Sequence, residues 1–125
     1  MNYLISTTSY HLLEDEIKKI VGEEENVSRY DLSYITLEEL IEEASYFSLF
    51  DEKKYLIVKS ADTIFNSKNK IGFPKLEKYF KEPNPQTTII FTSENKIDEK
   101  TNLSKVFKEN NNQIITIKAL TIKEI

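Results

Sequence analysis

Residues 6–11 follow the first predicted strand, where a nucleotide site would be expected, and their types do not suit phosphate binding. A phosphate-binding loop needs glycines, whose backbone turns tightly and points N–H groups at the anion. It also needs a lysine and a Ser or Thr for the phosphates and magnesium. Here the segment reads STTSYH, and the chain's two glycines, Gly22 and Gly72, lie elsewhere. The sequence therefore predicts no nucleotide cofactor.

A phosphoacceptor receiver domain is a second enzyme-like possibility, since it also uses five parallel strands in about this length. Thr92 or Ser93 and Lys118 stand where such a fold would place its switch hydroxyl and its lysine. The magnesium would need two acids after the first strand, which the sequence lacks. The third predicted strand ends at Lys59 rather than at an acceptor aspartate, and Asp62 comes too late. These residues are better interpreted as surface hydroxyls and a solvated lysine than as parts of a phosphoacceptor site.

No other group of residues suggests catalysis. The chain has no cysteine and one histidine, His11, so it cannot form thiol nucleophiles, Cys-ligated zinc sites or His-rich metal sites. Residues 98–100 (DEK) fit the electrostatics of a helix start better than acid–base chemistry. We therefore expect no catalytic residues, no metal and no cofactor, and a domain that is not itself an enzyme.

The dense apolar segment at residues 46–50 predicts a binding surface instead. Tyr46, Phe47, Leu49 and Phe50 cannot all point to one side at helical spacing, so some of them must be exposed. A Leu-Phe pair beside the polar Ser48 is the kind of anchor that fills a pocket on a partner protein. In the alternative interpretation, Phe47 and Phe50 cover the edge of the sheet and only Tyr46 is exposed.

The elements that position these residues alternate regularly along the chain. Strands are predicted at residues 3–6, 27–32, 55–59, 87–92 and 113–118. Helices are predicted between them: one capped by Ser9 and ended by Gly22, one from Thr36 to about Ser45, one from Pro74 to Pro83, and one that starts at Asp98 or Thr101. Residues 62–72 are predicted to form a polar loop.

This alternation predicts an α/β fold with three layers, in which helices cover both faces of a five-stranded, mainly parallel sheet. The polar strand at residues 27–32 is expected at an edge. The clearest boundary is the helix start at Thr36, which forms a capping box with Glu39 inside a hydrophobic staple of Ile35 and Leu40.

Length and charge limit the remaining possibilities. A chain of 125 residues predicts one domain, 1–125. The absence of cysteine, of an apolar span and of a signal-peptide pattern predicts a cytoplasmic protein without membrane contact. The net charge is −4, and Arg29 is the only arginine among 17 basic residues, so direct contact with DNA is expected to be weak or indirect.

The sequence resembles the N-terminal domain of the delta subunit of bacterial DNA polymerase III, the clamp-loader wrench. The resemblance is most specific in the run at residues 37–58, which includes LEELIEEA and SLFDEKKYLIV. It also includes YLI at residues 3–5, LLE at 12–14, YDL at 30–32 and TIIF at 88–91.

The resemblance implies a degenerate AAA+ (P-loop NTPase-like) domain with strand order 5-1-4-3-2, in which the first loop has lost nucleotide binding. It implies that Leu49 and Phe50, with Phe47 and Ser48 beside them, insert into the β sliding clamp and help to open the ring. Contacts with other clamp-loader subunits, tau/gamma and delta prime, would be made by C-terminal helical and collar domains absent from these 125 residues. Residues 121–125, which read as the first turn of a further helix, agree with such a fragment. The alternative function is a divergent nucleotide-binding ATPase or a receiver-type phosphoswitch.

Overall fold

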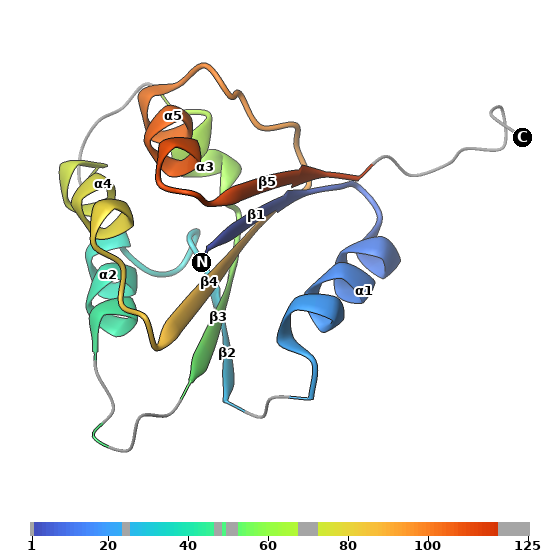
Figure 1. Ribbon diagram of the computed structural model, residues 1–125. Helices are drawn as coiled ribbons and strands as arrows, with labels where there is room; N and C mark the ends of the chain where they lie inside the picture. The colour runs from blue at the N-terminus through green and yellow to red at the C-terminus, as the bar shows by residue number, and fades with distance from the viewer. Residues whose placement is uncertain (1, 24–25, 47–48, 50–52, 68–72, 118–125) are drawn as a thin grey trace, which may run out of the picture.

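The fold is built on a parallel five-stranded sheet with the order β2-β3-β4-β1-β5 (Figure 1). This computed structural model describes residues 2–23, 26–46, 49, 53–67 and 73–117. All four strand pairs are parallel, and the order is the expected 5-1-4-3-2. The strands are β1 (Tyr3–Ser6), β2 (Val27–Asp31), β3 (Lys54–Lys59), β4 (Thr87–Ser93) and β5 (Gln113–Thr116). The α/β prediction is confirmed, and the half-buried β2 lies at an edge as expected.

Helices cover both faces of the sheet, so the three-layer prediction is confirmed. Figure 1 shows α1 (Tyr10–Val21) alone on one face. Ile17 and Val21 of this helix pack there against the sheet residues Ile5, Ile57 and Ile90. The opposite face carries α2 (Leu37–Ser45), α3 (Asp62–Phe65), α4 (Phe73–Lys81) and α5 (Asn102–Glu109), which bury the larger core.

The predicted helix starts are confirmed because each depends on local chemistry. Ser9 accepts a hydrogen bond from the Leu12 N–H at the start of α1, and Gly22 ends that helix with a φ of 68°. Thr36 and Glu39 form the expected capping box. Of the two alternative starts for α5, the structure places the N-cap at Thr101. These side chains satisfy N–H groups that a helix end leaves without an intrahelical partner.

The expected loop at residues 62–72 is wrong in its first part. Residues 62–65 form the short helix α3, and residues 68–72 lie outside the described part of the chain. Ala61, Ile64 and Phe65 are buried on one side, at the i, i+3, i+4 spacing of a helix. These three apolar positions outweigh the polar composition around them, so the described residues contain five helices rather than the expected four.

Thr36→Ala is expected to destabilise the fold by about 1 kcal/mol, because it removes the hydroxyl that accepts the Glu39 N–H at 3.1 Å. Urea denaturation would measure the change. Thr8→Ala is the control, since Thr8 is an exposed threonine that caps no helix. An unchanged midpoint for Thr36→Ala would show that the capping box does not contribute to stability.

Candidate functional site

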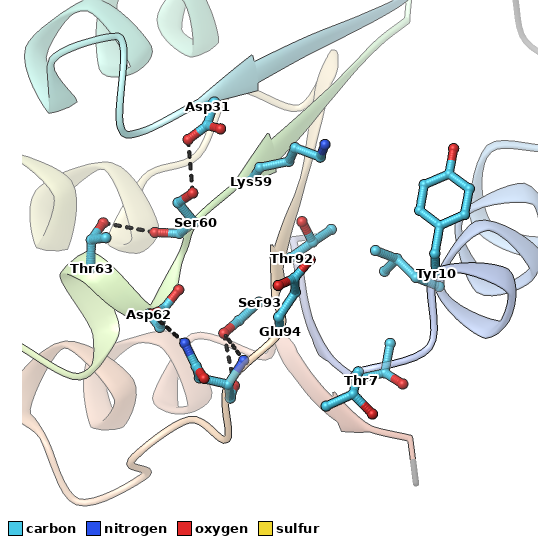
Figure 2. A pocket seen from close by; sticks show the side chains of 13 residues that line it. Thr7, Tyr10, Asp31, Lys59, Ser60, Asp62, Thr63, Thr92, Ser93 and Glu94 are labelled. Carbon is cyan, nitrogen blue, oxygen red and sulfur yellow. Dashed lines mark hydrogen bonds between the residues drawn. The ribbon is translucent and has the colours of Figure 1, made fainter. Parts of the chain in front are cut away.

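The strand ends of the sheet enclose a cavity of about 340 Å³ (Figure 2). Ligands bind beyond the carboxyl ends of parallel strands, so this is where a nucleotide or phosphoacceptor site would lie. The lining residues come from the ends of four strands and from α1 and α3. They are Thr7, Thr8, Tyr10, Leu13, Asp31, Lys59, Ser60, Asp62, Thr63, Thr92, Ser93, Glu94 and Asn95.

The charge of this cavity disfavours a polyphosphate. Three carboxylates line it, those of Asp31, Asp62 and Glu94, against the single cation of Lys59. Figure 2 shows Asp31 and Lys59 on one side and Tyr10 across from them. A triphosphate placed here would meet more negative than positive charge. No cluster of three or more His, Cys, Asp or Glu side chains that could hold a metal ion occurs among the described residues.

Several hydrogen-bonding groups of the short loop between β1 and α1 are bonded within the chain. The Thr7 N–H donates to the Ser93 carbonyl at 3.0 Å, and the Ser9 N–H donates to Thr7 Oγ1 at 3.2 Å. The Leu12 N–H, in the first turn of α1, donates to Ser9 Oγ at 3.2 Å. Phosphate binding at a helix start requires such N–H groups to be directed at the anion. His11 lies at the surface, 3.5 Å from the Asp15 carboxylate, as an ordinary helix-face pair.

Asp31 is the most firmly held carboxylate of the cavity. Its Oδ1 accepts a hydrogen bond from the Ser33 N–H at 2.9 Å and another from the Ser60 hydroxyl at 2.8 Å. These two bonds, the backbone one first, lower the pKa of Asp31 below its ordinary value. Ser60 adopts a left-handed φ of 64°, which a residue with a side chain rarely takes. Asp31 therefore stays ionised at neutral pH, and its hydrogen bond with Ser60 stabilises the turn after β3.

A separate surface lies at the other end of the sheet, between α2 and β3. Leu49 is 96% exposed there, and Tyr46, at the C-terminal end of α2, is 68% exposed. The prediction that part of this aromatic segment is exposed is confirmed, and Tyr46 is not its only exposed member. Phe47, Ser48 and Phe50 lie outside the described residues. The binding role of all four candidate residues stays a prediction.

Sequence reasoning missed Asn84, a buried residue bonded to the helix end beside this surface. Asn84 lies between Pro83 and Pro85 in the turn from α4 to β4, and its side chain is bonded to the end of α2. A signal was present, since an asparagine between two prolines is excluded from regular helix and favours a turn. Nothing in the sequence indicates that this turn reaches a helix that ends almost forty residues earlier.

Comparison with known proteins decides the family. The family model for the DNA polymerase III delta subunit matches residues 2–118. The chain belongs to this family. It is also similar to the solved structure of the Bacillus subtilis DNA clamp loader delta protein (YqeN), with 26% sequence identity and a TM-score of 0.79. The similarity covers 98% of this chain and 40% of that one. No curated protein matches the chain.

The receiver alternative relied on the hydroxyls of Thr92 and Ser93. The geometry of these hydroxyls agrees with membership in the delta subunit family rather than in the receiver family. Thr92 and Ser93 are buried, so the expectation of surface hydroxyls is wrong, and the Thr92 hydroxyl points to the Val58 carbonyl at 3.5 Å. Ser93 Oγ donates to the Asn95 carbonyl at 2.7 Å. Lys118 lies outside the described residues. Both hydroxyls are thus engaged with the backbone of the chain.

We expect this delta-family chain to show no saturable binding of Mg-ATP at micromolar concentrations. The carboxylates of the cavity repel a triphosphate, and two amides of the β1–α1 loop, those of Thr7 and Ser9, are already bonded within the chain. Isothermal titration would measure ATP binding, and incubation with a small phosphodonor would test the receiver alternative in parallel. A saturable isotherm, or a stable phosphoprotein, would contradict the expectation.

Proposed function

We propose that this delta-family chain is the module of a bacterial clamp loader that binds the β sliding clamp and helps to open it. In this proposal Leu49 and Phe50, with Phe47 and Ser48 beside them, enter a hydrophobic cleft on the ring. The observation that carries the proposal is the 96% exposure of Leu49 in a chain of this family. A large aliphatic side chain held away from its own core is available to fill a pocket on a partner.

The module would act without chemistry of its own. The acid-lined cavity at the strand ends gives no support for nucleotide hydrolysis, so energy for loading would come from other subunits. Contacts with those subunits, tau/gamma and delta prime, would be made by parts of a longer delta protein, since the chain spans 40% of the structure it resembles. No described helix is long and apolar enough to cross a membrane. As part of the replication machinery it would work in the cytoplasm, with weak or indirect DNA contact.

Direct binding to the cognate sliding clamp tests this function. The chain is immobilised through a terminal tag, and purified clamp is titrated over it by biolayer interferometry. We expect saturable binding, because the anchor residues need no other subunit to reach the ring. A fluorophore pair across one clamp interface would report opening separately. Absence of saturable binding to the cognate clamp would overturn the proposed function.

A further inference from the structure

The end of α2 is fixed by a side chain from a distant turn. Asn84 is 4% exposed, and its carboxamide Nδ2 donates to the Ala44 carbonyl at 3.1 Å and to the Tyr46 carbonyl at 3.0 Å. Its Oδ1 accepts the Gln86 N–H at 3.0 Å. The carboxamide therefore links the turn before β4 to the last carbonyls of the helix that precedes the Leu49 surface.

This ending differs from that of α1. There Gly22 takes a positive φ and its own N–H returns to the Lys18 carbonyl, so the chain closes the helix locally. At α2 the corresponding residue, Tyr46, is extended, with φ −70° and ψ 125°. An extended exit leaves terminal helix carbonyls in need of an outside donor. Asn84 supplies that donor.

The start of β3 lies beside the start of β4, next to the same turn (Figure 1). Asn26 Nδ2 donates to the Lys53 carbonyl at 3.2 Å, and the Lys54 N–H donates to the Gln86 carbonyl at 2.8 Å. Gln86 thus meets both Asn84 and the first residue of β3. The exit from α2 and the entry into β3 are both tied to the turn at residues 84–86.

The side chain of Lys54 joins the two ends directly. Its ammonium donates to the Glu43 carbonyl, lies 3.8 Å from the Glu43 carboxylate and sits 5.3 Å from the centre of the Tyr46 ring. It is only 12% exposed, so solvent weakens these contacts less than at an open surface.

We propose that Asn84 is a positioning residue for clamp binding: its carboxamide fixes the exit of α2 and so the place at which Leu49 is presented. The inference rests on the proposed function. Pre-organised anchors bind more tightly because less conformational freedom is lost on association. Removal of Asn84 leaves the carbonyls of Ala44 and Tyr46 without this donor, and the chain beyond Tyr46 loses its fixed starting direction.

The test compares Asn84→Ala with Asn112→Ala. Asn112 is 8% exposed, and its Nδ2 donates to the Phe107 carbonyl near the end of α5, so it makes the same type of bond at another helix. Clamp affinity is measured per folded molecule. We expect Asn84→Ala to weaken binding about tenfold and Asn112→Ala to leave it unchanged. In the Leu49→Ala background, Asn84→Ala should add little, because the anchor it positions is gone.

A second variant covers the case in which Asn84→Ala fails to fold. Lys54→Met keeps the alkyl stem and removes the contacts of the ammonium, and it too should weaken clamp binding while Asn112→Ala does not. Amide exchange in the last turn of α2, at residues 43–45, gives a readout in the free chain that needs no clamp, and it should accelerate in both variants. Equal affinities of the wild type, Asn84→Ala and Lys54→Met would overturn the positioning role. Absence of wild-type binding would overturn the proposed function instead, and unchanged exchange in the last turn of α2 would then also overturn the positioning role.

Discussion

The double variant Leu49→Ala, Phe50→Ala is expected to bind the sliding clamp at least two orders of magnitude more weakly than the wild type, with little change in melting temperature. Anchor residues that fill a desolvated pocket typically account for about 2 kcal/mol or more each. Each tenfold change in affinity corresponds to roughly 1.4 kcal/mol. The loss of both anchors therefore exceeds the free energy of two tenfold steps. Leu49 is 96% exposed in the free chain, so its truncation removes almost no core packing.

The same variant separates a binding role from a structural one when affinity and stability are measured on one preparation. Tyr34→Ala is the matched control, because Tyr34 is 88% exposed and lies in the turn after β2, at the opposite end of the sheet. It should change neither quantity. If the double variant instead lost about 3 kcal/mol or more in folding and kept its affinity per folded molecule, the pair would belong to the core. The binding site would then be assigned wrongly.

The parts of the fold that could be predicted from the sequence are those set by neighbouring residues. The capping box at Thr36 needs only a hydroxyl and a Glu three positions later. Buried strands such as β3 and β4 form apolar runs because both of their faces are covered. The order of the strands in the sheet is not set by neighbouring residues. It came from the resemblance to the delta subunit, since alternation alone does not say which strands are neighbours.

The candidate site was predicted less completely, because its contacts join segments far apart in the chain. The crowding of residues 46–50 was sufficient to predict exposure, and Leu49 confirms it. The bonds from Asn84 to the end of α2 depend on where α4 delivers the chain, which no local pattern encodes. The gathering of Asp31, Asp62 and Glu94 around one cavity likewise follows from the sheet, which brings three strand ends together.

Phe65→Ala is expected to destabilise the fold far more than the loss of the helix cap at Thr36. Phe65 belongs to α3, the helix that the polar composition of residues 62–72 concealed, and it is fully buried. Its ring lies 5.3 Å from the centre of Phe91 on β4 and 5.3 Å from that of Phe107 on α5, both edge to face. The ring of Phe80 on α4 lies 6.5 Å away. Phe65 therefore contacts the sheet and two helices at once.

Truncation of this ring leaves a cavity bordered by β4, α4 and α5, and these elements cannot all move in to fill it. Phe→Ala changes in such cores cost about 3 to 5 kcal/mol, a large share of the roughly 5 to 15 kcal/mol that typically stabilises a domain. The hydrogen bond from the Thr101 hydroxyl to the Phe65 backbone carbonyl, at 2.7 Å, involves no atom of the Phe65 side chain, so the expected loss reports the ring. Urea denaturation measures it, and Phe65→Leu should lose less because it fills part of the space. A loss below about 1 kcal/mol would mean that α3 does not pack its ring into the core, since surface substitutions fall in that range.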